Sequence, residues 1–356
     1  SCGRVGYARR RATPSAADVR AARLVAFGTA PVFELHELPA PVAGAGEVVV
    51  DIHAAALNRR DPWVWQTAGY CSLPVTLGSD GAGIVSAVGA GVDDISIGDA
   101  VVINPTLGWA DGEDVPGPDF DILGAPLDGT FAESVRIPHE NVAPMPAGWS
   151  FEHAAALSLG GLTAWRATVS CAGARRGSTL LVTGASGGVA TFAIQIAVAI
   201  GARVFVTSSS PAKIERAVSL GAAGGVLHDD PSWLERLRTL AGGGVDAIID
   251  SYGGNTWRRL LTALRDGGRL VTFGDTGGAS AEVEIMDVYW HWRSIVGTTM
   301  GSPREYRALL QHVGSHAWRP VIDRSYPLHE IADAARRLDA PDRFGKVVVR
   351  VRDDEP

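Results

Sequence analysis

The sequence predicts an α/β protein with two domains, a barrel-like β domain and a doubly wound parallel sheet. At about 150 residues per domain, a chain of 356 residues suggests two domains. Its 43 glycines and 20 prolines are spread along the chain, as expected for many short elements joined by turns. After Pro146 the pattern changes to apolar strands alternating with amphipathic helices. We therefore expect the parallel sheet in the second part of the chain.

The β domain is predicted from short alternating runs bounded by Gly, Asp and Pro. These strands are expected at residues 22–27, 34–37, 47–54, 82–88, 100–103 and 131–137. Such a set matches a barrel. Residues 105–130 form a lobe rich in Gly, Pro and Asp that shows no period.

The second domain is predicted from a helix at residues 151–172, followed by six strands with helices between them. The strands are expected at residues 179–183, 203–207, 225–227, 247–250, 269–273 and 294–297, and the helices near 188–200, 211–220, 232–241 and 255–264. Beyond Ser302 we expect a helix, a strand, a helix and a last strand at 303–313, 321–326, 328–338 and 346–351.

The domain boundaries follow from these elements. Residues 1–18 carry four arginines and no period, so we interpret them as a surface tail rather than a transit presequence. Residues 19–149 and 300–356 are expected to form one discontinuous domain around a dinucleotide-binding domain of residues 150–299.

Composition excludes several classes of partner. The formal net charge is -7, so no bulk positive field recruits nucleic acid or an anionic membrane. No apolar run reaches the roughly 20 residues that cross a bilayer. The three cysteines, Cys2, Cys71 and Cys171, lie far apart and form no CxxC pair, which favours a cytoplasmic location. We expect a soluble protein with small-molecule partners.

A Gly-rich turn between a strand and a long apolar helix is the strongest local motif. Ala185-x-Gly187-x-x-Ala190 follows the G-x-G-x-x-G/A pattern, with alanine at the first glycine. Gly187 would let the backbone approach a pyrophosphate, and the helix N-terminus would offer N–H groups to it. The alternative is a tight turn without a ligand.

The end of the next strand predicts which nicotinamide cofactor is bound. An acid at this position would hold a ribose 2′-hydroxyl, but residues 207–213 contain none. The hydroxyls of Ser208 and Ser209 and the ammonium of Lys213 suit a 2′-phosphate, so we expect NADPH. Alternatively, the serines cap a helix and Lys213 is a solvated cation.

Several motifs in one order resemble the medium-chain dehydrogenase/reductase superfamily, specifically its zinc-independent, quinone-oxidoreductase-like branch. The resemblance covers nearly all of residues 19–352. Its motifs lie at residues 54–61, 77–83, 129–133, 161–165, 250–254 and 344–348, besides the Gly-rich turn. It implies a GroES-like substrate domain, a Rossmann domain and a homodimer or homotetramer.

The same resemblance predicts that no zinc is bound. Zinc-dependent members place cysteine, histidine and a further cysteine or acid at positions that correspond here to Asn58, Ser79 and Leu159. The lobe of residues 105–130 contains no cysteine for a structural zinc. We interpret His53, His228 and His291 as packed or surface residues.

The resemblance also implies roles for individual residues. Asn58 would contact nicotinamide or substrate, Tyr70 would be a weak acid in the cleft, and Trp63 would be an apolar wall. Alternatively, Asn58 and Asp61 cap a helix that begins at Pro62.

The remaining cofactor contacts are carried over by position. Besides Ser208, Ser209 and Lys213, they are Asn58, Thr163, Ser186, Gly187, Gly188, Val189, Phe273, Gly274, Thr276, Thr298 and Lys346. Lys346 would contact the pyrophosphate or, alternatively, be a solvated lysine of an edge strand. The aromatic residues 289–292 are interpreted as packing or an oligomer surface, or as part of a partner's pocket.

These expectations predict a zinc-independent, NADPH-dependent oxidoreductase that transfers hydride to a quinone, enone or related carbonyl substrate. The alternatives are a non-catalytic NADPH-binding protein and an alcohol dehydrogenase-like enzyme of the same superfamily. An enzyme needs an open apolar space above the nicotinamide, whereas a binding protein can fill it.

Overall fold

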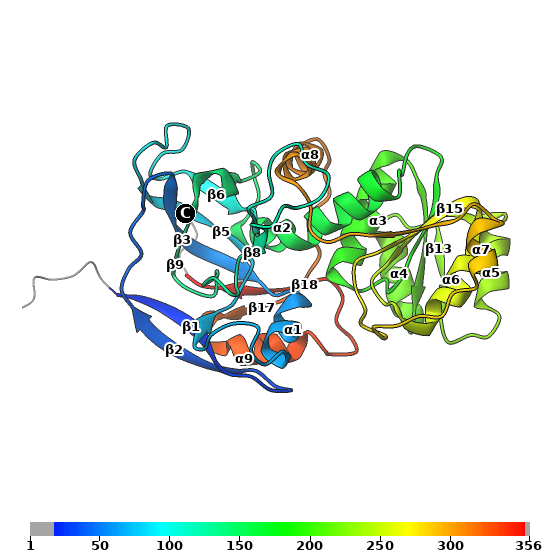
Figure 1. Ribbon diagram of the computed structural model, residues 1–356, viewed down its shortest axis with the longest axis horizontal. Helices are drawn as coiled ribbons and strands as arrows, with labels where there is room; N and C mark the ends of the chain where they lie inside the picture. The colour runs from blue at the N-terminus through cyan, green and yellow to red at the C-terminus, as the bar shows by residue number, and fades with distance from the viewer. Residues whose placement is uncertain (1–17, 353–356) are drawn as a thin grey trace, which may run out of the picture.

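The computed structural model describes residues 18–352 and shows two halves side by side (Figure 1). Most of the predicted tail, residues 1–17, lies outside the described residues, as do residues 353–356. The first half is built mainly of antiparallel strands and the second half is a parallel sheet flanked by helices. This arrangement confirms the predicted fold class.

The first half contains two main sheets, whose strands pair antiparallel except for the parallel pair of β17 and β18. The smaller has the order β2-β1-β4, with β1 at Val19–Ala26, β2 at Val32–Leu38 and β4 at Val75–Thr76. The larger has the order β10-β6-β5-β3-β18-β17, and β9 also pairs with β3. Its strands are β3 (Glu47–Ala56), β5 (Asp80–Val88), β6 (Ala100–Ile103), β9 (Ser134–Pro138), β10 (Val142–Pro144), β17 (Ile322–Pro327) and β18 (Lys346–Arg350). Buried side chains of these strands, including Val50 and Ile103, form the core together with Phe131, which precedes β9.

The last strand of the chain returns to the first half. β18 pairs antiparallel with β3, and Val348 lies opposite Ala56. This pairing brings residue 346 next to the end of β3 and next to α1 (Arg60–Gln66), which follows β3. Residues almost 300 positions apart in the sequence therefore meet at the inner edge of this sheet.

The second half is a six-stranded parallel sheet with the order β13-β12-β11-β14-β15-β16. The strands are β11 (Thr179–Val182), β12 (Arg203–Ser208), β13 (Gly224–Leu227), β14 (Val245–Asp250), β15 (Leu264–Thr272) and β16 (Ser294–Gly297). The connecting helices are α3 (Gly188–Ile200), α4 (Pro211–Ser219), α5 (Trp233–Ala241) and α6 (Trp257–Ala263). The strand order reverses between β11 and β14, where such sheets bind ligands at the carboxyl ends of their strands.

Helix α2 (Phe151–Trp165) joins the halves and is almost entirely buried. Ser150 caps it by accepting a hydrogen bond from His153 N. The single helix expected for residues 151–172 is corrected, because residues 166–171 are a π-helix. In this wider turn, Arg166 and Ser170 both donate hydrogen bonds to Glu305 of α8 (Pro303–Gly314).

Some further elements differ from the prediction. The lobe of residues 105–130 contains a two-stranded sheet of β7 (Thr106–Leu107) and β8 (Asp121–Ile122), too short to show a period. Helix α1 begins at Arg60 rather than at Pro62. The short α7 (Ile285–Tyr289) was not predicted, since none of its residues is buried. Helix α9 (Ile331–Arg337) packs against β17 and β18. Within residues 18–352, no helix is long and apolar enough to cross a bilayer.

Candidate dinucleotide site and interdomain cleft

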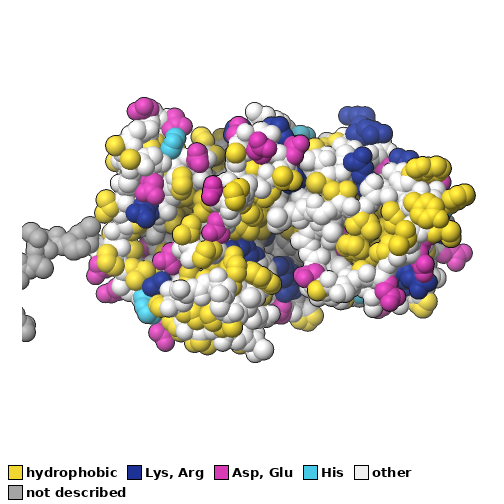
Figure 2. All heavy atoms as spheres, in the orientation of Figure 1, with side chains coloured by type: hydrophobic (Ala, Val, Ile, Leu, Met, Phe, Trp, Pro, Cys, Tyr) yellow, Lys and Arg dark blue, Asp and Glu magenta, His cyan; other side chains and the backbone are white. Residues whose placement is uncertain are grey.

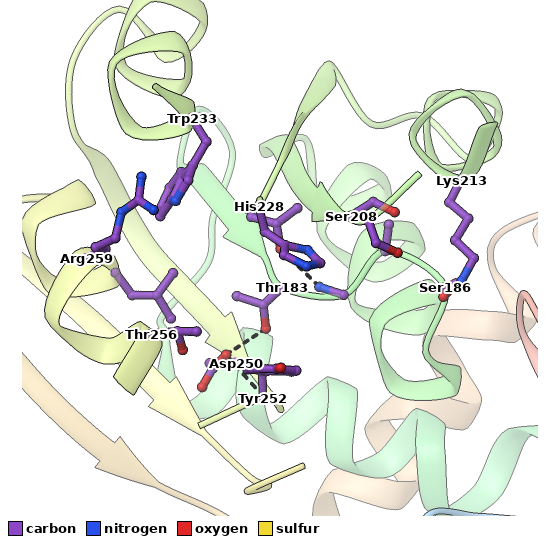
Figure 3. Close-up of a pocket in the computed structure, with 15 residues that line it drawn as sticks. Thr183, Ser186, Ser208, Lys213, His228, Trp233, Asp250, Tyr252, Thr256 and Arg259 are labelled. Carbon is purple, nitrogen blue, oxygen red and sulfur yellow. Dashed lines mark hydrogen bonds between the residues drawn. The ribbon is translucent and has the colours of Figure 1, made fainter. Parts of the chain in front are cut away.

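A cavity of about 220 Å³ opens at the carboxyl ends of the central parallel strands. Its lining comes from the loops after β11, β12, β13 and β14 and from the first turns of the helices that follow (Figure 3). The lining residues are Thr183, Gly184, Ala185, Ser186, Thr207, Ser208, Ser209, Lys213, His228, Trp233, Asp250, Tyr252, Thr256, Arg259 and Leu260. Four residues expected from the sequence, Ser186, Ser208, Ser209 and Lys213, thus share one cavity.

The Gly-rich turn presents unused backbone donors beside this cavity. Gly184 has a φ of 67°, which favours glycine, and Ala185 N donates to Thr207 O on the neighbouring strand. Gly187 occupies the N-cap of α3, and no side chain caps this helix. The N–H groups of Gly188 and Val189, in the first turn, have no partner within α3, because the first N–H groups of a helix lack intrahelical acceptors. This end of α3 is chemically suited to an anion.

The segment after β12 carries hydroxyls and one ammonium group. Ser208 Oγ accepts a hydrogen bond from Ser210 N, and residues 207–213 contain no carboxylate. Lys213 makes no hydrogen bond or ion pair within residues 18–352. Its ammonium points toward Ser186 of the Gly-rich turn (Figure 3). Desolvation, followed by the positive charge of Arg343, lowers the pKa of Lys213.

The far wall of the cavity was not predicted from the sequence. Trp233 is buried, and the guanidinium of Arg259 lies 4.9 Å from its ring centroid. His228, which we interpreted as a packed or surface residue, lines the cavity at the end of β13. The one sequence signal that could have indicated Trp233, Arg259 and His228 as cavity residues is their position in the segments that follow β13 and β14. The buried Asp250 accepts four hydrogen bonds, from Thr183 Oγ1 and from Tyr252 N, Gly253 N and Trp257 Nε1, and so fixes this wall.

This donor set fits a dinucleotide that carries a phosphate on one ribose. The uncapped N-terminus of α3 suits the pyrophosphate, and hydroxyls and an uncompensated ammonium follow β12. The apolar faces of Trp233 and Leu260 suit a flat aromatic ring. Gly188 leaves room for the Lys346 side chain, since a Cβ there would lie 3.0 Å from Lys346 Cδ.

A buried polar network lies where the two halves meet. Lys346 Nζ donates to Asp80 Oδ2 at 2.8 Å and to Asn58 Oδ1 at 2.5 Å. Asn58 Nδ2 also donates to Asp80 Oδ2, and Leu159 N donates to Asp80 Oδ1. Asp80 is fully buried and Lys346 is 3% exposed, so Lys346 is not a solvated edge-strand residue. In this structure its ammonium bonds protein groups.

The network does not fit the zinc that relatives of the resembled family hold. Of the three matched positions, Leu159 has no ligand atom and the Asn58 amide is bonded to Lys346 and Asp80. Ser79 Oγ is buried without a partner among the described residues, and a serine hydroxyl is not one of the Cys, His, Asp or Glu ligands that usually hold Zn²⁺. Across residues 18–352 no cluster of three or more His, Cys, Asp or Glu side chains could hold a metal ion.

An apolar cluster adjoins the network at Leu159. Trp109, Leu159 and Met300 are buried together, with Phe120 and Ile122 packed against them. They come from the lobe, from α2 and from the segment after β16. These side chains form a water-poor wall that adjoins the polar network through Leu159, whose N–H donates to Asp80.

Arg166 fixes the lobe to the second half beside that wall. Its guanidinium lies 5.1 Å from the Trp109 ring centroid and donates to Thr298 Oγ1, Glu305 Oε2 and Asp114 O. The expected cofactor residue Thr298 is therefore positioned by Arg166. Thr163, on the buried face of α2, donates its hydroxyl to Leu159 O.

Tyr70 and Trp63 lie on the first half, outside the dinucleotide cavity. Their rings meet edge to face with centroids 4.6 Å apart, and Trp63 is half exposed. Tyr70 Oη accepts a hydrogen bond from Arg60 Nη2 at 3.3 Å and lies 3.4 Å from Ala125 O. Arg60 also bonds Ile122 O of the lobe.

The other expected residues lie either after β15 or at the start of α1. Phe273, Gly274 and Thr276 follow β15 at the same sheet edge but do not line the cavity. Asp61 is buried in the first turn of α1, and its Oδ2 accepts Asn58 N at 2.7 Å. Asp61 thus holds the turn before α1, but the capping alternative is wrong, because the N-cap residue is Arg59 and no side chain caps this helix.

Two family profiles match the chain. The alcohol dehydrogenase GroES-like domain matches residues 44–147, and the zinc-binding dehydrogenase domain matches residues 188–315. A zinc-type alcohol dehydrogenase-like protein of Leptosphaeria maculans is 34% identical over 346 residues, covering 89% of this chain and 94% of that protein. The quinone oxidoreductase of Homo sapiens is 28% identical over 331 residues, covering 90% and 94%.

Solved structures show the same architecture. The crystal structure of an NAD-dependent alcohol dehydrogenase superposes with a TM-score of 0.88 and 40% identity, covering 94% of this chain and 100% of that one. A putative alcohol dehydrogenase from Sinorhizobium meliloti gives a TM-score of 0.89 and 32% identity, covering 95% and 100%.

Proposed function

Because the chain belongs to the medium-chain dehydrogenase/reductase superfamily and is an oxidoreductase, we propose that it transfers hydride from NADPH to a quinone, enone or related carbonyl without zinc. The observation that carries the proposal is the Asn58–Asp80–Lys346 network at the matched metal positions. A lysine ammonium and its hydrogen-bond partners occupy the space in which zinc-dependent members gather ligands. The substrate carbonyl must then be activated by hydrogen bonding and placement.

The preference for NADPH is supported by the charges after β12. A carboxylate there would repel a 2′-phosphate, but this segment offers Ser208, Ser209 and the uncompensated ammonium of Lys213. The 40%-identical neighbour is an NAD-dependent alcohol dehydrogenase, so the choice between NADPH and NADH is tested directly below.

In this mechanism the cofactor supplies a hydride at its nicotinamide ring. The chain's own groups bind and orient it: the N-terminus of α3 takes the pyrophosphate, and Thr163 and Thr298 border the nicotinamide end. The wall of Trp109, Leu159 and Met300 excludes water from the reacting carbon. Tyr70, beside the Arg60 cation, is the candidate donor of the proton that completes reduction.

The substrate class is tested by following NADPH oxidation with a panel of quinones, enones, aldehydes and alcohols. Turnover of quinones or enones supports the proposal. Turnover restricted to alcohols and aldehydes would favour an alcohol dehydrogenase-like enzyme, and NADPH binding without any turnover would favour a binding protein.

A homo-oligomer is proposed from an apolar patch on the second half. Ile285, Met286, Tyr289, Trp290 and Trp292 are all more than half exposed, and Figure 2 shows apolar side chains gathered over α7. The neighbouring β16 is the last strand of its sheet, so its outer edge can pair with a second copy. Light scattering of the parent and of Trp290→Asp tests this interface. A monomeric parent would contradict it.

A cytoplasmic location is proposed from the thiols. Cys71 and Cys171 are both free among the described residues, as expected in a reducing compartment.

A further inference from the structure

The segment 339–345, between α9 and β18, reaches from the first half onto the Gly-rich turn of the second. Gly345 N donates a hydrogen bond to Ser186 O at 3.0 Å. The neighbouring Phe344 ring lies 4.1 Å from the guanidinium of Arg216 on α4. Lys346, next along the chain, packs its Cδ against Gly188. These contacts hold the segment beside the turn and beside α4.

Arg343 is fixed within this segment by carbonyl groups alone. Its Nε donates to Leu338 O at 3.0 Å and its Nη1 donates to Gly345 O at 2.7 Å. Among residues 18–352 no carboxylate forms an ion pair with it, and of its nitrogen atoms Nε and Nη1 donate hydrogen bonds while Nη2 donates none. Burial and, after it, the positive charge of Arg59 lower the pKa of Arg343 to about 10. The guanidinium is therefore desolvated without a counter-ion.

The nearby carboxylates are already engaged. Asp323 and Asp342 both pair with Arg337, and Asp323 also accepts Phe344 N. Asp339 pairs with Arg59. Within the described chain these acids leave Arg343 unpaired.

Lys213, on α4, is the second cation at this point. It has no hydrogen bond or ion pair among the described residues, and its ammonium points toward Ser186, to which the segment 339–345 is bonded (Figure 3). Among charged groups, Arg343 has the largest effect on the pKa of Lys213, and its positive charge lowers that pKa. Two like charges held close together without a protein counter-ion are stabilised by a bound anion.

We propose that Arg343 and Lys213, from opposite halves of the molecule, together bind the 2′-phosphate of NADPH. This inference rests on the proposed use of NADPH and adds a specificity residue from the first half. An arginine fork matches phosphate geometry, and Arg343 has Nη2 free for it. Because the phosphate contacts both halves, NADPH joins the segment 339–345 to α4 and NADH does not.

The test measures dissociation constants by isothermal titration calorimetry, with NADPH, NADH, 2′,5′-ADP and 5′-AMP as ligands. Arg343→Gln should weaken NADPH and 2′,5′-ADP roughly tenfold or more, as expected for loss of a charge-assisted bond. NADH and 5′-AMP should change by less than about twofold on the same reasoning. Arg343→Lys keeps the charge and should retain most of the preference. Arg336→Ala, which removes an exposed cation of α9, is the matched control and should bind all four ligands as the parent does.

Each alternative result is decisive. If Arg343→Gln weakens NADPH and NADH equally, the residue supports the turn or the pyrophosphate, and the inference is wrong. If Lys213→Ala reduces NADPH binding but Arg343→Gln does not, the inference fails while the NADPH proposal stands. If the parent binds NADH as tightly as NADPH, the NADPH proposal itself fails.

Discussion

Lys346 Nζ lies 2.8 Å from Asp80 Oδ2, and both side chains are almost completely shielded from solvent. The pair joins the first residue of β18 to the first residue of β5, at the face of the first half that meets α2 and α3. Figure 2 shows Lys and Arg side chains along the hollow between the two halves. The pair orders the inner end of this hollow, because Asn58 and Leu159 N complete the hydrogen bonds of Asp80.

Replacing Lys346 alone should destabilise the fold strongly. Lys346→Met leaves the Asp80 carboxylate buried without its cation, a change that typically costs about 3–5 kcal/mol. Asp80→Asn combined with Lys346→Met removes both charges and should restore much of the free energy of unfolding. Urea unfolding of the three proteins checks this prediction. A double variant no more stable than Lys346→Met would show that the ion pair does not carry the effect.

Asp61 should make the folded protein less stable as the pH rises, which is the opposite of the usual effect of a carboxylate. Burial raises the pKa of Asp61 from 3.8 to about 6, although the hydrogen bond from Asn58 N and the charges of Arg60 and Lys346 lower it. The folded state therefore holds a proton between these two values that the unfolded state has lost. The resulting cost is absent below about pH 4, grows as the pH rises, and reaches about 2–3 kcal/mol above pH 6.

Asp61→Asn should accordingly be more stable than the parent at pH 7.5 and equally stable near pH 4. The asparagine can still accept the Asn58 N–H, so this hydrogen bond before α1 is kept. Chemical unfolding at both pH values checks the difference. A variant that is less stable than the parent at pH 7.5 contradicts the assignment.

Tyr70→Phe should lower kcat by about 100-fold while leaving the dissociation constant of NADPH unchanged, because a positioned general acid contributes roughly that factor. The ring contact with Trp63 is kept, so folding is not disturbed. Steady-state kinetics and calorimetry measure the two effects. An unchanged kcat would mean that another group or water supplies the proton.

Lys213→Ala should weaken NADPH binding about tenfold or more and leave NADH binding almost unchanged. The reason is that its ammonium has no protein partner among the described residues and follows β12 on α4. Arg175→Ala, which removes an exposed cation before β11, is the control. Equal weakening of both cofactors would make Lys213 a general surface cation.

The fold could be predicted from sequence because its signals are local. The periodicity of apolar residues predicted all six parallel strands, and the family resemblance predicted the two domain types. The residues after β11 and β12 were predicted because a Gly-rich turn and a following polar segment have sequence patterns of their own. The two-residue strands β7 and β8 and the exposed helix α7 carry no such pattern.

The contacts that cross the fold could not be predicted in the same way. Trp233 and Arg259 belong to the cavity only because parallel strands bring the loops after β13 and β14 together. Lys346 was expected at the pyrophosphate, but nothing in its neighbourhood of the sequence indicates that it pairs with Asp80, 266 positions away. Arg343 likewise gains its setting from the hydrogen bond between Gly345 and Ser186.

We propose that this oxidoreductase uses NADPH and no zinc. One preparation should be analysed for metal content after dialysis against buffer without chelator, and assayed for NADPH oxidation with quinones and enones before and after treatment with a chelator. We expect far less than one zinc per chain, full activity after chelation, and a clear preference for NADPH over NADH. One zinc per chain, with activity lost on chelation and restored by zinc, would contradict it.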